Sequence, residues 1–134
     1  MSRKAVLTTD APPPLPQFSQ AIKCNGMIYC SGNIGVDPAT NKLVDGGIKA
    51  ETRMALGNLS AVLRAGGASL ADVVKVNVFL TTMDDFQHLN EAYDEAFCNT
   101  VPKPCRTAIA VYQLPLGAKV EIECSAILPP QAKI

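Results

Sequence analysis

An arginine and a glutamate near the C-terminus carry the strongest chemical signal in this sequence. Arg106 lies in Pro104-Cys105-Arg106-Thr107, and Glu121 lies in Val120-Glu121-Ile122-Glu123. Because a guanidinium presents forked N–H donors that match a carboxylate, Arg106 is a candidate clamp for a small carboxylate. A partly desolvated carboxyl can be tuned toward proton transfer near neutral pH, which makes Glu121 a candidate for handling protons beside that clamp.

Both residues fall in segments that alternate with the period of two typical of β-strands. In the segment 105–112, Arg106 shares its face with small alanine side chains, which leaves room for a ligand. By spacing alone, an ion pair between Arg106 and Glu121 on neighbouring strands is favoured over a catalytic pair. The segment 119–128 has one apolar and one polar face, and the polar face carries Glu121, Glu123 and Ser125.

The rest of the chain must position these two strands. Asn25-Gly26, between the segments 18–24 and 27–31, predicts a tight two-residue hairpin. Helical spacing of apolar residues predicts one helix over 47–65 and a second, starting near Thr82, that ends before Pro102. Alternation over 74–80 predicts another strand. The order is roughly ββαβαββ, so we expect an α+β fold in a single domain over residues 1–134, with a mixed sheet of about six strands and two helices on one face.

Charge and hydropathy exclude several classes of function. Twelve basic and twelve acidic side chains cancel, so the chain has no net field to attract a phosphate backbone, and nucleic-acid binding is not expected. The apolar run from Val73 to Leu80 is interrupted by Lys75 and Asn77 and falls short of the roughly 20 residues of a membrane span. No signal peptide is predicted, so the expected location is cytoplasmic, with a mitochondrial pool left open.

Metal and triad chemistry are also disfavoured. The five cysteines form no C-x-x-C pair and their odd number does not fit a disulfide framework, so we expect reduced thiols. His88 is the only histidine, which leaves the usual zinc ligand sets incomplete and offers one imidazole base at most. Its surroundings indicate a surface position on a helix. We therefore predict no metal site.

Longer motifs resemble one family over the whole chain. The segment Pro104-Cys105-Arg106-Thr107-Ala108-Ile109-Ala110-Val111-Tyr112-Gln113-Leu114-Pro115, followed by Val120-Glu121-Ile122-Glu123, resembles the C-terminal signature of the RidA/YjgF family, also called the endoribonuclease L-PSP family. The similarity includes Met27-Ile28-Tyr29-Cys30-Ser31-Gly32 and Asn90-Glu91-Ala92-Tyr93. It implies a chorismate-mutase-like fold assembled as a homotrimer, with ligand clefts between subunits.

The resemblance also implies an activity and its residues. The family hydrolyses reactive enamines and imines, such as 2-iminobutanoate and 2-iminopropanoate made by PLP-dependent dehydratases, to 2-keto acids and ammonia without a cofactor. This would make the protein a deaminase, a hydrolase acting on C=N bonds. Arg106 would hold the substrate carboxylate, and Glu121 would position or activate water. The positions that match the cleft lining are Ser31, Gly32, Asn90 and the backbone at Ala108.

Two positions depart from the family pattern. Phe18 stands where a tyrosine is common, so the ring is kept and a hydroxyl is lost. We therefore expect Phe18 to form part of the cleft wall, with an altered rate or substrate preference. Ala108 replaces a frequent cysteine, which removes any thiol role at that position.

Two other functions remain open at this point. The first is a non-enzymatic trimer that binds small carboxylates or partner proteins as a regulator or chaperone. The second, taken from the older family name, is RNA cleavage with inhibition of translation, which the zero net charge and the absence of tryptophan argue against. The sequence does not determine the preferred imine, the subunit that supplies each cleft residue, or the organelle.

Overall fold

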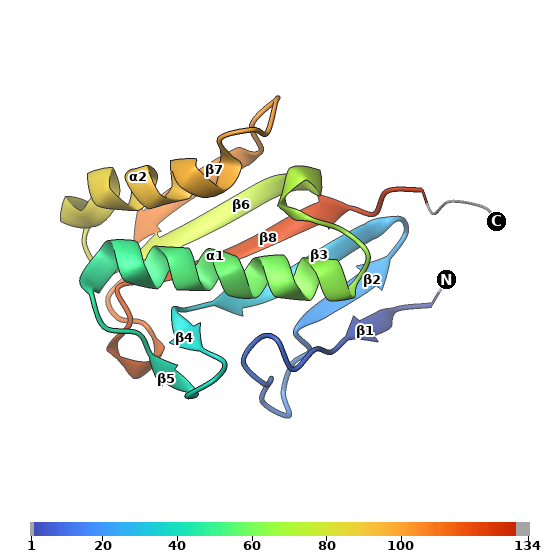
Figure 1. Ribbon diagram of the computed structural model, residues 1–134, viewed down its shortest axis with the longest axis horizontal. Coiled ribbons are helices and arrows are strands. Elements are labelled where there is room, and N and C mark those ends of the chain that lie inside the picture. The colour runs from blue at the N-terminus through green and yellow to red at the C-terminus, as the bar shows by residue number, and fades with distance from the viewer. Residues whose placement is uncertain (1, 131–134) are drawn as a thin grey trace.

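A computed structural model describes residues 2–130 and shows one six-stranded sheet with two helices on the same face (Figure 1). The strands follow the order β1-β2-β3-β8-β6-β7, in which β6 and β7 run parallel and all other neighbours run antiparallel. The expected α+β class and the two helices on one face are confirmed. The elements of this layer pair are β1 (Lys4–Val6), β2 (Ala21–Cys24), β3 (Met27–Asn33), α1 (Gly47–Ala65), β6 (Val73–Leu80), α2 (Phe86–Phe97), β7 (Cys105–Ala110) and β8 (Val120–Ile127).

The predicted hairpin is present, with a shorter first strand than expected. Asn25 and Gly26 have φ angles of 56° and 75°, and Cys24 pairs with Met27. Asparagine and glycine tolerate these left-handed conformations, which a tight turn between twisted strands requires. The prediction that Phe18 begins the first strand is wrong, because β2 starts at Ala21 and the amide of Phe18 donates to the carbonyl of Leu15 in a preceding turn.

Several short elements give no clear signal in the sequence. β1 has three residues and lies at the sheet edge, where it pairs with β2. β4 (Val36–Asp37) and β5 (Lys42–Leu43) form a separate two-stranded ribbon. The 3-10 turns are η1 (Leu70–Asp72), η2 (Met83–Asp85) and η3 (Pro115–Gly117). Strands of two or three residues are too short to show an alternating pattern.

The two helices begin and end close to the predicted residues. α1 covers 47–65 as expected and is followed by Gly66 and by Gly67, which has a φ of 95°. The hydroxyl of Thr82, near which the second helix was predicted to start, accepts a hydrogen bond from the amide of Asp84 and so caps η2, which leads into α2. Within residues 2–130, no helix is long and apolar enough to cross a membrane.

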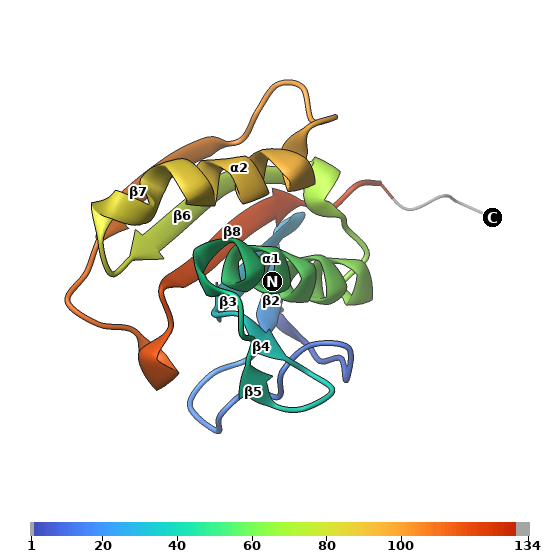
Figure 2. The ribbon, with the colours of Figure 1, turned by 60° about the vertical axis from the view of Figure 1, so that its left-hand side comes forward.

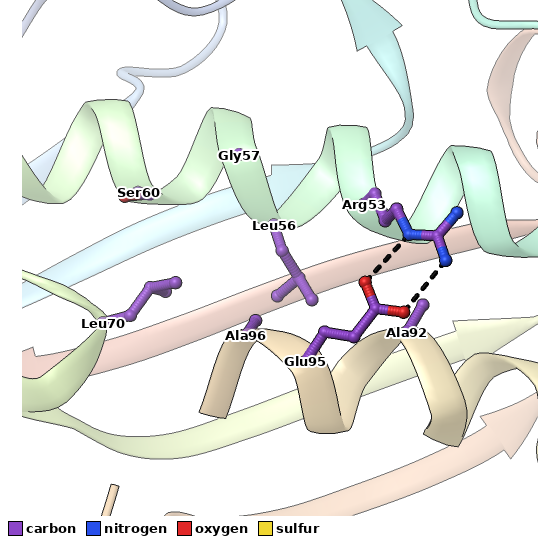
Figure 3. A pocket seen from close by; sticks show the side chains of 8 residues that line it. All are labelled: Arg53, Leu56, Gly57, Ser60, Leu70, Ala92, Glu95 and Ala96. Atoms are coloured by element: carbon purple, nitrogen blue, oxygen red, sulfur yellow. Dashed lines mark hydrogen bonds and ion pairs between the residues drawn. The ribbon is translucent and has the colours of Figure 1, made fainter. Parts of the chain in front are cut away.

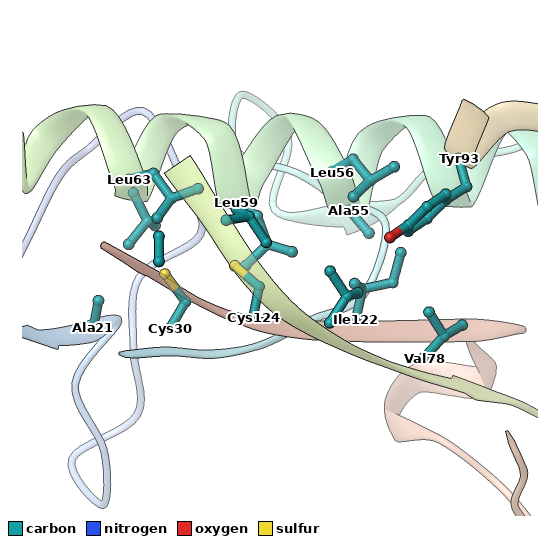
Figure 4. Packing of buried hydrophobic residues seen from close by; sticks show 14 of the residues in the cluster. Ala21, Cys30, Ala55, Leu56, Leu59, Leu63, Val78, Tyr93, Ile122 and Cys124 are labelled. Atoms are coloured by element: carbon teal, nitrogen blue, oxygen red, sulfur yellow. The ribbon is translucent and has the colours of Figure 1, made fainter. Parts of the chain in front are cut away.

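The hydrophobic core lies between the helices and one face of the sheet (Figure 4). Alternation puts Val120, Ile122 and Cys124 of β8 on this face, as predicted, opposite Leu59 and Leu63 of α1. Each fully buried aliphatic side chain of this kind contributes about 1.5–3 kcal/mol relative to exposure. In the view turned by 60°, both helices again lie on the same side, and none of the described residues 2–130 forms an α-helix on the other sheet face (Figure 2). That face presents the half-exposed side chains of Tyr29, Ile109 and Ile127.

Candidate functional site

Arg106 lies on the edge strand β7, on the face that α2 covers. Its Nη1 donates a hydrogen bond of 2.7 Å to Oδ1 of Asn90. Its Cζ lies 4.7 Å from the ring centroid of Tyr93 and 5.6 Å from that of Phe86. A cation stacked on aromatic rings gains roughly 0.5–2 kcal/mol and loses rotational freedom. The two rings thus fix the orientation of the guanidinium plane, and Asn90 accepts a hydrogen bond from one of its five N–H donors.

The helical spacing of three residues in α2 places them around the Arg106 guanidinium. Phe86, Asn90 and Tyr93 are separated by four and three residues, which places them on one side of a helix. Asn90 and Tyr93, together with Arg106, border a cleft of about 360 Å³ that also includes Lys103. The sequence prediction included Asn90 and missed the two rings, although their spacing was the signal that could have identified them.

The hydroxyl of Tyr93 has no role in holding Arg106. It is buried and has no hydrogen-bond partner among residues 2–130. Burial raises the pKa of Tyr93, while the positive charge of Arg106 opposes that rise. The ring is therefore the part of Tyr93 that serves the site, and the hydroxyl is an energetic cost.

Glu121 lies on the opposite face of the sheet, beside Gly32. The register between β3 and β8 shifts between Cys30 and Asn33, so Gly32 sits in an irregular part of the strand. A Cβ atom at Gly32 would overlap the carboxylate of Glu121, at 3.0 Å from Cδ. Glycine is required here for this approach. Burial raises the pKa of Glu121 above its ordinary value, and the negative charge of Glu123 raises it further.

Glu121 borders a second cleft, of about 590 Å³. Phe18, Ser31 and Gly32 line it as well, so the structure brings four of the predicted site residues together. The hydroxyl of Ser31 donates to the carbonyl of Ser19 at 2.7 Å, which fixes its position. Apolar side chains form much of the remaining wall: Pro12, Pro13, Leu15, Ile34, Val36, Pro115 and Leu116.

The predicted pairing of Arg106 with Glu121 is wrong within one chain. β6 lies between β7 and β8, so the two residues are not on neighbouring strands. Their side chains also point to opposite faces, since Arg106 pairs with buried Val76 whereas Glu121 pairs with Phe79. No ion pair between them occurs in the described part of the chain. The chain therefore carries two separate candidate regions, one around Arg106 and one around Glu121, which we call candidate half-sites.

Ala108, the remaining predicted site residue, lies outside both clefts. Ala108 follows Arg106 on the same face of β7 and packs against the core. His88 is exposed on α2, where its Nδ1 lies 3.2 Å from Oε1 of Glu91, as expected for a surface histidine. Among residues 2–130, no three His, Cys, Asp or Glu side chains gather in a way that could hold a metal ion.

A third hollow, of about 290 Å³, lies between α1 and α2 and holds none of the predicted residues (Figure 3). At one end Arg53 donates two hydrogen bonds, of 3.0 and 2.9 Å, to the carboxylate of Glu95. The exposed ion pair and the apolar floor join the two helices. None of the residues that line this groove also lines the cleft around Arg106 or the cleft around Glu121.

Comparison with known proteins gives consistent matches over most of the chain. Residues 8–128 match the family model described as endoribonuclease L-PSP. The mouse (Mus musculus) protein named 2-iminobutanoate/2-iminopropanoate deaminase is 41% identical over 131 residues, which cover 98% of this chain and 96% of that protein. The crystal structure of yeast Mmf1 has a TM-score of 0.91 at 36% identity, covering 96% of this chain and 100% of that one. Escherichia coli TdcF with bound serine has a TM-score of 0.87 at 32% identity, covering 92% and 98%.

Proposed function

The chain belongs to the endoribonuclease L-PSP family, which includes the RidA/YjgF proteins, and we propose that it is a 2-iminobutanoate/2-iminopropanoate deaminase. The reaction adds water to the C=N bond of a 2-imino acid and releases a 2-keto acid and ammonia. Relatives of about 40% identity that carry this name support the proposal, among them the mouse, mite, rat and bovine proteins. We propose the cytoplasm as its location.

In this proposal Arg106 binds the substrate carboxylate. Asn90 occupies one edge of the guanidinium, and the rings of Tyr93 and Phe86 hold its plane, so the other N–H donors are oriented before substrate arrives. Such pre-orientation lowers the entropic cost of binding in a reactive geometry. A bidentate arginine–carboxylate pair also fixes the direction of the attached C=N bond.

Glu121 is proposed to handle water and protons. Its carboxylate takes a proton from water as the water oxygen bonds to the imine carbon and passes that proton to nitrogen, which gives a carbinolamine. A second proton then moves from the carbinolamine hydroxyl through Glu121 to the amino nitrogen, the C–N bond breaks, and ammonia leaves as C=O forms. Partial burial and the neighbouring charge of Glu123 raise its pKa, which favours this exchange of protons nearer to neutral pH. An imine is already electrophilic, so orientation and a proton shuttle suffice.

The two half-sites motivate the second part of the proposal, a homotrimer in which each cleft lies between subunits. Arg106 and Glu121 cannot meet within one chain, because they lie on opposite faces of the sheet with β6 between their strands. The helix-free sheet face carries half-exposed Tyr29, Ile109 and Ile127, which a neighbouring subunit would bury. Arg106 of one subunit would then complete the Glu121 half-site of the next.

The observation that carries the proposal is that the chain presents a pre-oriented arginine, Arg106, and a glutamate with a raised pKa, Glu121, on two separate surfaces that a second subunit could bring together. A coupled assay tests the chemistry: an amino-acid dehydratase supplies the imine, a competing trap captures it, and keto-acid release is followed. Wild type should accelerate release, and Arg106→Ala should not. Equal rates for the two proteins would eliminate the deaminase assignment.

A mixing experiment tests the location of the cleft. Arg106→Ala chains and Glu121→Gln chains are each expected to be inactive, but co-expression would create trimers in which one interface has both intact residues. Random assembly around a three-fold ring restores about a quarter of the sites. Light scattering checks the trimer. Recovery of no activity from co-assembled chains would place the site within one subunit.

Phe18 is proposed to form part of the wall of the Glu121 half-site. Its ring is about half exposed and lines the 590 Å³ cleft. We expect Phe18→Tyr to change the rate or the order of preference among imines, because a hydroxyl would enter the cleft. Unchanged kinetics with every substrate would count against this role.

A non-enzymatic carboxylate-binding protein is the second candidate. TdcF, with the same fold, was crystallised with serine bound, and serine carries a carboxylate. A binder requires Arg106 but not Glu121. Full deaminase activity in Glu121→Gln would remove the proposed mechanism, and serine binding without any imine hydrolysis would favour the binder.

A further inference from the structure

Two cysteines of the core lie directly opposite each other on neighbouring strands. Cys30 of β3 is the register partner of Cys124 of β8. Both are buried, with 8% and 7% of their surface exposed, and both lie on the helix-covered face beneath α1 (Figure 4). Neither residue belongs to the proposed deaminase chemistry, and both thiols are free in this structure.

The hydrogen-bond pattern fixes the type of this cross-strand pair. The amide of Ser31 donates to Gln20 of the lead-in to β2, so the amide of the preceding residue, Cys30, points the other way, toward β8. The amide of Leu128 donates a hydrogen bond to the carbonyl of Gly26, so the even-numbered residues 26, 28 and 30 direct their backbone polar groups toward β8. Cys30 and Cys124 therefore form a hydrogen-bonded pair, for which the Cα atoms are typically about 5.5 Å apart. Disulfides most often join Cα atoms separated by about 5.5–6 Å.

The two thiols also interact with each other. A hydrogen bond to Cys30 and burial raise the pKa of the Cys124 thiol, which keeps that thiol protonated. The side chains around the pair are apolar and include Leu59 and Leu63 of α1. Such surroundings slow the reaction of both thiols, so a small neutral oxidant would have to reach them during brief openings of the core.

We infer that Cys30 and Cys124 are a redox-modification site that forms an intrachain disulfide when the protein meets hydrogen peroxide. The Cys30 sulfur attacks one peroxide oxygen, the O–O bond breaks, and Cys30 sulfenic acid and water form. The sulfur of Cys124 then bonds to that of Cys30, and the sulfenic hydroxyl leaves with the Cys124 proton as a second water. Two thiols are oxidised by two electrons, and one peroxide is reduced to two waters.

The position of the bond gives it a structural consequence. It would join β3 to β8 immediately before Ser31 and Gly32, at the start of the register shift. The remaining thiols lie elsewhere: Cys98 and Cys105 are exposed, and Cys24 is half-buried in the hairpin. Core packing would shield the disulfide from reductants, so oxidation and reduction are both expected to be slow in the folded protein.

The test isolates the pair. In a variant with Cys24→Ser, Cys98→Ser and Cys105→Ser, only Cys30 and Cys124 remain. The folded variant is treated with hydrogen peroxide, quenched, denatured and analysed for free thiols and intact mass. We expect both thiols to be lost, a mass decrease of about 2 Da for the two hydrogens, and one peptide pair joining residues 30 and 124. Dithiothreitol applied after unfolding should restore both thiols.

Matched variants decide the alternatives. Adding Cys30→Ala or Cys124→Ala to the triple variant should leave one thiol and no mass decrease, and circular dichroism shows which of the two retains its fold. In the otherwise unmodified chain, the same peptide pair joining residues 30 and 124 should form, in addition to any oxidation of the exposed Cys98 and Cys105. Two free thiols after oxidation of the folded triple variant would overturn the inference, as would sulfinic or sulfonic products without a cross-link. A cross-link formed only in urea would overturn it too.

Discussion

Gly32→Ala should reduce catalysis by displacing the carboxylate of Glu121. A Cβ at Gly32 would overlap the carboxylate oxygen and would lie 3.0 Å from Cδ and 3.1 Å from Cγ. Carbon atoms in ordinary contact are separated by about 3.5–4.0 Å, so the carboxyl group must move by up to about 1 Å. Misplacement of a catalytic group by about 1 Å can cost on the order of 10²-fold in rate. We therefore expect kcat to fall about 100-fold.

The same substitution should leave KM and stability nearly unchanged. Arg106, which we propose to bind the substrate carboxylate, belongs to the other half-site. Gly32 has no positive φ angle, so alanine fits the backbone there, and Glu121 is a flexible side chain that can yield. The assay is keto-acid release in the dehydratase-coupled reaction, with thermal unfolding measured on the same samples.

Gly57→Ala is the matched control. Gly57 lies inside α1, and a Cβ there would meet nothing within 4 Å. Alanine is favoured over glycine in a helix by up to about 1 kcal/mol, so this variant should be more stable and fully active. It shows that adding a methyl group to a glycine does not itself reduce activity.

A double-mutant cycle can refute the reasoning. If Gly32→Ala acts through Glu121, adding it to Glu121→Ala should cause no further loss. Losses that multiply would show that Gly32 acts by another route. Wild-type kcat in Gly32→Ala would refute the assignment of Glu121 at this position.

Three further predictions follow from the two half-sites. Arg106→Lys keeps the charge but loses the fork, so we expect kcat/KM to fall at least about 10-fold, with a larger loss in Arg106→Ala; steady-state kinetics equal to wild type for the lysine variant would contradict bidentate binding. Burial raises the pKa of Glu121 in the folded state above its ordinary value, so ionisation of this carboxyl destabilises the fold as the pH rises through the folded-state pKa. Urea unfolding midpoints should therefore show Glu121→Gln to be more stable than wild type at pH 8, and the two proteins to be equally stable near pH 3. The reverse order of stability would contradict burial as the cause of the raised pKa. Tyr93→Phe should keep KM and match or exceed wild-type stability, because the lost hydroxyl has no partner in the described residues, whereas Tyr93→Leu should raise KM several-fold; a raised KM in the phenylalanine variant would assign a role to the hydroxyl.

The local sequence pattern predicted helices and strands well where it extended over many residues. The spacing of apolar residues placed α1 at residues 47–65, and Asn25-Gly26 identified the hairpin turn. The prediction failed for β1 and for the β4–β5 ribbon, which are too short to alternate. It also extended the first hairpin strand back to Phe18, because the sequence does not mark where pairing with β3 begins.

By itself, the sequence determined which residue types could carry the chemistry and which faces they share along their own strands. Alternation along β8 places the side chain of Glu121 on the opposite face of the strand from Val120 and Ile122, and this follows from backbone geometry alone. Only the tertiary structure decided how the strands are ordered. Long-range pairing inserts β6 between β7 and β8, which separates Arg106 from Glu121, while α2 brings Asn90 and Tyr93 over the guanidinium. Pairing partners of this kind depend on the burial of the whole sheet, and no local period encodes them.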